Sequence, residues 1–212
     1  MPPAGAATRE KLLDAATRAF AERGIANASL LDITMQAGQR NRGSLYYYFG
    51  SRDGVVVAVL DRHVGFLAMR EGELLEKAQT EPGLAPVVEA VVRPATELAE
   101  SGWRGRCCLQ IIAELAEEDP RDLAPEVQAA LERTGGPAVY DTLAERMPPM
   151  PESLRNERFA LFTSFIVRAV ADRARLMGRR RKGRPQLDRE AFVANLVAMG
   201  AAALAVDLES PL

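Results

Sequence analysis

The sequence has 212 residues, is 48% hydrophobic and 26% charged, and carries a formal net charge of −2 at pH 7, the balance of a globular protein with a buried core. No stretch approaches the roughly eighteen uncharged apolar residues of a membrane span, and the N-terminal residues lack the basic start and apolar run of a secretion signal. We therefore expect a cytoplasmic protein without membrane contact. His63 is the only histidine, which argues against a metal centre or a histidine-based catalytic site.

The first fifty residues predict three short helices. Apolar side chains recur at helical spacing over Thr8–Arg23. Ser29 is expected to cap a second helix that ends near Gly38, and Asn41 to cap a third that runs to about Tyr48. Two short helices joined by a tight polar turn have the plan of a helix-turn-helix, in which the second helix presents the side chains of its N-terminal end to the DNA major groove.

The charge distribution supports the same interpretation. Residues 1–52 carry seven Lys or Arg against four Asp or Glu, so this segment is about +3 and the remaining residues are about −5. Such an asymmetry suits a small basic module that meets DNA phosphates, joined to an acidic body that does not.

The rest of the chain also predicts helices. Ser51 is expected to cap a helix over Arg52–Gln79, a rod of roughly 40 Å. Cys107 and Cys108 are expected to be reduced and buried, because adjacent cysteines rarely form a disulfide; a thiol sensor is the alternative. We predict an all-α fold of about nine helices, a three-helix head followed by a larger helical domain. The later helices are expected over residues 84–100, which Pro94 would kink or split, 102–118, 125–133, 137–147, 152–177 and 188–207.

Residues 37–53 closely resemble the signature of TetR-type bacterial regulators. That family shares an AG pair, a turn, a stretch of the form G-S/T-LY-x-H/Y-F and a basic residue that opens a long helix. The resemblance extends over residues of about 8–60. Here the turn between Gly38 and Gly43 holds four residues, where the commonest form of the family has three, so Asn41 rather than Arg40 would cap the recognition helix. The matching run is Ala37-Gly38, then Gly43-Ser44-Leu45-Tyr46-Tyr47-Tyr48-Phe49-Gly50-Ser51-Arg52-Asp53.

This resemblance implies a transcriptional regulator, and a repressor is the type that we expect. It would bind a palindromic operator in double-stranded DNA as a homodimer and be released by a small-molecule inducer. It implies a DNA-binding domain at residues 1–52 and a helical ligand-binding and dimerisation domain at residues 53–212. The alternative for the aromatic run Tyr46–Phe49 is that it forms the ordinary core of a small bundle. By the resemblance, bases would be read by Arg42, Ser44 and Tyr47, and phosphates held by Ser29, Tyr46, Tyr48 and Arg52.

The resemblance also implies that the last two long helices pair with those of a second subunit in a four-helix bundle. An intramolecular core without a dimer is the alternative. The basic run Arg179–Arg184 would lie in a solvated loop between these helices, although by itself it would suggest a second nucleic-acid contact or an acidic partner. The apolar stripes expected to form the bundle are Phe159, Phe162, Ile166 and Val170 on the first helix, and Phe192, Leu196, Met199 and Ala203 on the second.

No cofactor is expected, and the effector is an unidentified small molecule; the lack of clustered acids and histidines argues against a metal. Two other classes of function stay open. An all-helical enzyme or carrier would need a nucleophile–base pair or a phosphate loop, and neither is visible. A protein–protein adaptor would show no salt-dependent affinity for DNA. A ligand pocket would lie among the middle helices, unless these residues are plain core, and would be lined by some of Phe66, Met69, Trp103, Cys108, Ile112, Tyr140, Phe165 and Arg168.

Overall fold

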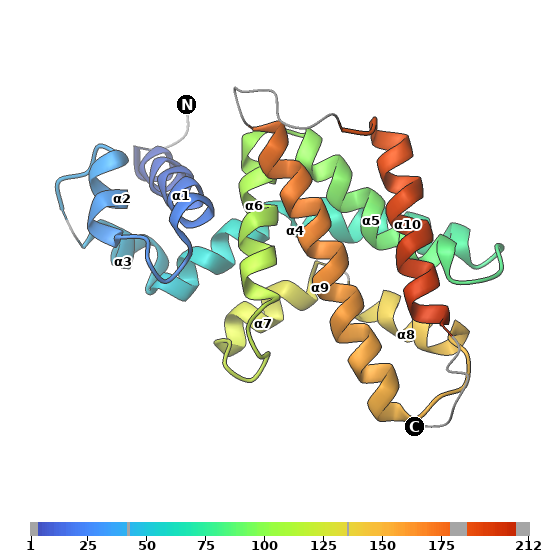
Figure 1. Ribbon diagram of the computed structural model, residues 1–212. Coiled ribbons are helices and arrows are strands. Elements are labelled where there is room, and N and C mark those ends of the chain that lie inside the picture. The colour runs from blue at the N-terminus through green and yellow to red at the C-terminus, as the bar shows by residue number, and fades with distance from the viewer. Residues whose placement is uncertain (1–3, 42, 135, 179–185, 207–212) are drawn as a thin grey trace.

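The computed structural model describes residues 4–41, 43–134, 136–178 and 186–206, and every regular element in these ranges is an α-helix (Figure 1). The predicted all-α fold is confirmed, with ten helices in the described ranges where about nine were expected. The basic run Arg179–Arg184 lies outside these ranges. The helices are α1 (Ala4–Arg23), α2 (Leu30–Gln36), α3 (Ser44–Phe49), α4 (Arg52–Ala78), α5 (Ala85–Glu100), α6 (Trp103–Leu115), α7 (Pro125–Glu132), α8 (Gly136–Arg146), α9 (Glu152–Met177) and α10 (Arg189–Ala205).

Local signals set most of the helix boundaries. The Ser29 hydroxyl accepts a hydrogen bond from the backbone N–H of Asp32 at 3.2 Å, and the Ser51 hydroxyl accepts one from Gly54 at 2.9 Å, so both predicted caps are confirmed. Helix α5 continues through Pro94 and is not split. No helix in the described part of the chain is long and apolar enough to cross a membrane.

The head, formed by α1 to α3, shares a hydrophobic cluster with the body. We call it the head cluster. It joins apolar side chains of α1, α2 and α3 to the first half of α4, and helices α6 and α7 of the body complete it; α6 runs beside α1 (Figure 1). Its members from the body helices are Cys108, Ile111, Leu115, Val127 and Ala130, none more than 6% exposed.

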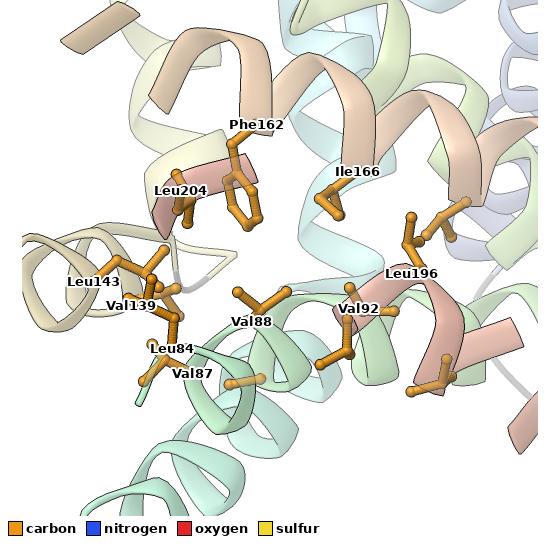
Figure 2. Close-up of a cluster of buried hydrophobic side chains, with 14 of the residues drawn as sticks. Leu84, Val87, Val88, Val92, Val139, Leu143, Phe162, Ile166, Leu196 and Leu204 are labelled. Atoms are coloured by element: carbon orange, nitrogen blue, oxygen red, sulfur yellow. The ribbon is translucent and has the colours of Figure 1, made fainter. Parts of the chain in front are cut away.

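A second cluster, which we call the body cluster, fills the space between α4, α5, α8, α9 and α10 (Figure 2). It contains most of the stripes that we had expected to form the dimer. Phe162, Ile166 and Val170 are at most 2% exposed, and Leu196 is 3% exposed, within a single chain. These four residues therefore belong to the intramolecular core, because the inner faces of α9 and α10 pack on α5. Phe159 and Phe192 are partly buried against the same cluster, whereas Met199 and Ala203 stay exposed.

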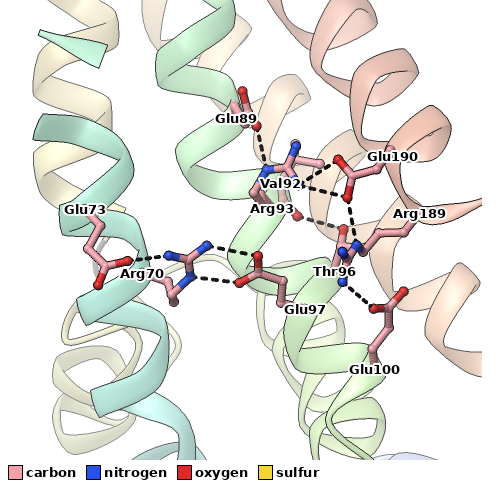
Figure 3. Close-up of polar contacts among 10 residues, drawn as sticks. All are labelled: Arg70, Glu73, Glu89, Val92, Arg93, Thr96, Glu97, Glu100, Arg189 and Glu190. Atoms are coloured by element: carbon pink, nitrogen blue, oxygen red, sulfur yellow. Dashed lines mark hydrogen bonds and ion pairs between the residues drawn. The ribbon is translucent and has the colours of Figure 1, made fainter. Parts of the chain in front are cut away.

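Ion pairs tie the second half of α4 to α5, and α5 to α10 (Figure 3). Arg70 on α4 donates to both carboxylate oxygens of Glu97 on α5, at 2.9 and 3.0 Å. Arg93 on α5 reaches Glu190 on α10 at 3.0 Å, and Arg189 on α10 reaches Glu100 on α5 at 3.0 Å. Pairs so close to solvent contribute about 0–1 kcal/mol each, so packing dominates the stability of the body.

The shared head cluster predicts that a core substitution in α6 loosens the DNA-binding head. Ile111→Ala removes a fully buried side chain and should lower the free energy of unfolding by about 2–5 kcal/mol. Amide hydrogen exchange in α1 should accelerate by a corresponding factor. Met69→Ala, at a position 54% exposed, is the control and should change neither quantity appreciably. Unchanged exchange in α1 of Ile111→Ala would show that the head is stable by itself.

Candidate nucleic-acid interface

The turn after α2 is fixed by backbone geometry. Gly38 has φ of +73°, its N–H donates to the Met35 carbonyl at 3.0 Å, and the N–H of Gln39 donates to the Thr34 carbonyl at 3.0 Å. This pair of bonds is a Schellman motif, which needs a left-handed residue at the glycine position. The Ala-Gly pair of the sequence signature thus ends α2 and directs the chain toward α3.

The entry into α3 differs from the prediction. Asn41 does not cap the helix: its side-chain oxygen accepts from the N–H of Gly43 at 2.8 Å, and its carbonyl accepts from Ser44 at 3.1 Å. The side chain reaches only two residues ahead, an Asx turn, so α3 begins at Ser44 with Gly43 in the cap position. The four-residue turn is therefore closed by Asn41 before the helix starts.

Helix α3 divides its aromatic residues between core and solvent. Leu45 is 2% exposed and holds the helix on the head cluster, whereas Tyr46 is 57% and Tyr47 is 83% exposed. Tyr48 and Phe49 are half-buried, and the Tyr48 ring meets Tyr47 edge-on at 5.0 Å between centroids. The alternative of an ordinary aromatic core therefore fails for Tyr46 and Tyr47, which face outward.

The other predicted DNA-contact residues occupy different settings. Ser29 caps α2, and Ser44 is half-buried at the first position of α3. Arg42 lies outside the described residues. Arg52 is half-buried and has an internal role: its Nη1 donates to the carbonyl oxygens of Ile25 and Ala28, the second at 2.9 Å. Its phosphate contact stays a prediction, but no sequence signal indicated that this guanidinium ties the α1–α2 loop to the start of α4.

Ion pairs and a cation–π contact link the head to α4 and α6. Asp14 on α1 accepts from Arg62 of α4 at 2.7 Å and from Arg104 of α6 at 2.6 Å. Burial by itself raises the pKa of the Asp14 carboxyl, but the hydrogen bonds from Arg104 and Arg62 outweigh it and lower the pKa. The Arg18 guanidinium lies 3.6 Å from the centre of the Trp103 ring, a cation–π contact between α1 and α6. Helix α3 is thus carried on a head whose orientation to α6 is fixed by these contacts.

Two family models match the chain. One, for bacterial regulatory proteins of the tetR family, matches residues 12–59, and the other, the Tetracyclin repressor-like C-terminal domain, matches residues 89–203, more than half of the chain. The chain belongs to the TetR family. Its members are DNA-binding transcriptional regulators.

Relatives of known name agree with this assignment. The chain is 27% identical over 168 residues to the HTH-type transcriptional repressor BdcR of Escherichia coli K12, and the match covers 78% of each chain. It is 43% identical over 54 residues to the HTH-type transcriptional regulator TtgR of Pseudomonas putida. This match covers 26% of this chain and 25% of TtgR.

Solved structures show the same fold. AibR, in complex with isovaleryl coenzyme A and operator DNA, is similar with a TM-score of 0.55 at 14% identity, covering 91% of this chain and 97% of AibR. PfmR, a TetR-family regulator from Thermus thermophilus, is similar with a TM-score of 0.51 at 18% identity, covering 94% of this chain and 97% of PfmR.

The eight predicted ligand-pocket residues of this TetR-family chain are divided among the head cluster, the surface and the body cluster. Trp103 lies under Arg18 between head and body, and Cys108 is fully buried in the head cluster, where burial raises the pKa of its thiol to about 12. Met69 and Phe165 are exposed, and Arg168 pairs with Glu117 at the surface. A further three, half-buried against the body cluster, are Phe66, Ile112 and Tyr140.

Sequence reasoning missed an acidic residue inside the body. Glu71 on α4 is 7% exposed and, among the described residues, makes no hydrogen bond or ion pair. Burial raises the pKa of its carboxyl to about 7. The available signal was its position: Glu71 falls four residues after Leu67 and three before Leu74, on the apolar face of the helix.

The contact between α3 and α4 leaves no room for a side chain at residue 54. A Cβ atom on Gly54 would lie 1.9 Å from the Phe49 carbonyl oxygen at the end of α3. Gly54→Ala should therefore push the recognition helix out of place, lower the free energy of unfolding by about 1–3 kcal/mol and weaken DNA binding. Gly72→Ala is the matched control, because a Cβ there meets open space on the same helix. Equal effects of the two substitutions in urea denaturation would contradict this contact.

The buried carboxyl of Glu71 predicts a pH-dependent stability. Between its unfolded pKa, near 4.5, and its folded pKa, about 7, the folded chain holds a proton that the unfolded chain has lost. Stability is therefore lost as pH rises through this window, and Glu71→Gln, which cannot ionise, should gain on the order of 2–3 kcal/mol relative to the parent between pH 5 and pH 8. Urea denaturation at both pH values, at one protein concentration, measures this gain. Glu76→Gln, at an exposed position of α4, should show none; a Glu71→Gln gain of zero would place the carboxyl in solvent.

Proposed function

We propose that this TetR-family protein is a repressor that binds a palindromic operator as a homodimer and releases it when a small molecule binds in the body. The observation that carries the proposal is the outward-facing end of α3, where Tyr47 is 83% exposed on a helix that Leu45 anchors in the head cluster. The relative BdcR is named a repressor, and AibR has been solved with both a small molecule and operator DNA. Because its proposed target is operator DNA, we propose that the protein acts in the cytoplasm.

The head offers two kinds of DNA contact. Tyr46 and Tyr47 present hydroxyl groups that can donate to phosphate oxygens and can donate to, or accept from, base edges. Arg40, exposed in the turn before α3, supplies positive charge beside them. Ser29 and Ser44, at the starts of α2 and α3, stay proposed contacts because their hydroxyls stand where backbone N–H groups point outward. Together these groups form a surface suited to the major groove.

The outer face of α10 is proposed to bind a second copy of the chain. Between Ala191 and Ala205 the only polar side chain is Asn195, so the helix is apolar all round. One face packs in the body cluster, and a helix of this kind normally has both faces covered. A second copy fits, because one head touches few base pairs and two heads about 34–36 Å apart read a palindrome. Outward-facing residues of this surface are Leu161 and Phe165 on α9 and Ala194, Ala198, Met199 and Ala202 on α10.

Selection from a random pool of double-stranded DNA, competed at rising salt, tests the repressor proposal. We expect enrichment of a palindrome, and Tyr47→Ala should lower discrimination between this operator and random DNA by about 1–3 kcal/mol if Tyr47 reads a base. An equal loss on both DNAs would make Tyr47 a phosphate contact. The absence of any enriched sequence would overturn sequence-specific binding by this chain.

Charge on the outer face of α10 should separate the subunits. Ala198→Glu places a carboxylate in the proposed interface. Burying this charge without a partner should cost more free energy than the contacts of the interface provide. The mass measured by light scattering should therefore fall from that of a dimer to that of a monomer. Operator affinity should fall at least tenfold in the same variant. Ala129→Glu, on the exposed side of α7, is the control and should remain dimeric. A dimer that survives Ala198→Glu would move the interface elsewhere.

A further inference from the structure

Glu71 stands in an apolar setting with nothing to neutralise it. The residues on its own face of α4 are Leu67, Leu74 and Leu75, all of which belong to the body cluster or pack against it. The neighbouring Arg70 is committed to Glu73 and Glu97 and points to α5 (Figure 3). In the described part of the chain Glu71 accepts no hydrogen bond and forms no ion pair, although its side chain is more than nine-tenths buried.

Tyr140 of α8 and Phe159 of α9 pack against the same body cluster as the leucines around Glu71. The Tyr140 hydroxyl of α8 is hydrogen-bonded to the Thr163 hydroxyl of α9, and Thr163 in turn donates to the Phe159 carbonyl at 2.8 Å. Burial raises the pKa of Tyr140, and the negative charge of Glu71 is close enough to raise it further. The rings of Tyr140 and Phe159 meet edge-on at 5.3 Å. Three helices thus bring one acid, two hydroxyls and two aromatic rings to one region of the body.

The charge of Glu71 and the side chains around it indicate which kind of ligand would bind there. The Glu71 residue is 7% exposed and no described residue donates to it, so its charged form loses much of its hydration. An incoming cation offsets this cost, whereas an incoming anion increases it. A single carboxylate is too few ligands for a calcium or magnesium site, which needs several oxygen donors. Aromatic and aliphatic walls favour an organic body behind the positive charge.

We propose that Glu71 is the anionic anchor of the effector site and that the effector is an organic cation, an amine carried on an apolar or aromatic body. This inference rests on the proposed function, of which release by a small molecule is part. We assign to the Tyr140 hydroxyl, which is bonded to Thr163, a hydrogen bond to the ligand, and to the leucines of α4 the contact with its apolar body.

The position of the anchor connects it to the DNA-binding head. Helix α4 carries Glu71 in its second half, and its first half, from Val55 to Leu60, lies in the head cluster. A ligand that enters beside Glu71 must loosen the packing of this part of α4 on the body cluster, where α5 is its main partner. The resulting displacement passes along one continuous helix to the segment that contacts the end of α3 at Gly54.

Calorimetric titration of the full chain without DNA, at pH 8, tests the ligand class. The probes are phenylalkylamines with two to six methylene groups and the alcohols of the same lengths, which keep the shape and lose the charge. The parent protein should bind at least one amine ten or more times as tightly as its alcohol. Glu71→Gln should reduce this preference to threefold or less, and the exposed control Glu76→Gln should retain it. If Glu71→Gln does not unfold cooperatively, Glu71→Met, which also removes the charge, is tested in its place.

The outcomes separate the two proposals. No preference for any amine in the parent, or a preference that survives Glu71→Gln, overturns the cation site even if an operator is found by DNA selection. A preference lost in Glu71→Gln supports the site, and the same amine should then lower operator affinity. If the amine binds through Glu71 but no DNA sequence is enriched, the repressor proposal fails while the cation site stands.

Discussion

A unit of about fifty residues buries little apolar surface by itself, and the head completes its core with Ile111 and Leu115 of α6. The first half of α4 lies in the same cluster, so α3, α4 and α6 are packed against shared neighbours. Asp14, held by Arg62 and Arg104, adds directional contacts to a cluster that is otherwise non-directional. The orientation of α3 is therefore fixed by the body, and α3 can be reoriented only if the packing between head and body changes.

Most of the fold was predictable because its signals are local. The hydroxyls of Ser29 and Ser51 cap the helices that follow them, since a cap needs only a side chain and an N–H three residues ahead. Gly38 ends α2 because its conformation is left-handed. The motif around α3 was readable for the same reason. Asn41 shows the limit of this reasoning, because a turn and a cap use the same side chain and sequence does not decide between them.

The site could be predicted only where contacts are near in sequence. Periodicity placed Phe162 and Ile166 on an apolar stripe, but an apolar stripe looks the same whether it meets its own chain or a partner, and here it meets α5. Arg52 bonds to carbonyls 27 and 24 residues away, and Trp103 stacks under an arginine of α1, so neither role has a sequence signal. The pocket stays a prediction, because it grouped residues by type across helices whose packing the sequence does not give; Phe66 and Tyr140 pack against the body cluster, whereas Trp103 and Cys108 lie toward the head.

The interactions that hold the two halves of α4 differ in strength, and this difference indicates which half is displaced more easily. Helix α4 buries five apolar side chains between Val55 and Leu60 at its head end, whereas its second half buries only Leu67 and Ala78. The pair of Arg70 with Glu97, which are 28% and 21% exposed, adds to this weaker packing. Partly exposed pairs contribute about 0–1 kcal/mol, while each large buried side chain of the head cluster contributes about 1.5–3 kcal/mol. The second half of α4 also contains Glu71, which opposes close packing when ionised. A disturbance there therefore meets less resistance than one at the head, and because the head cluster holds together, α3 moves with α4 and α6 instead of separating from them.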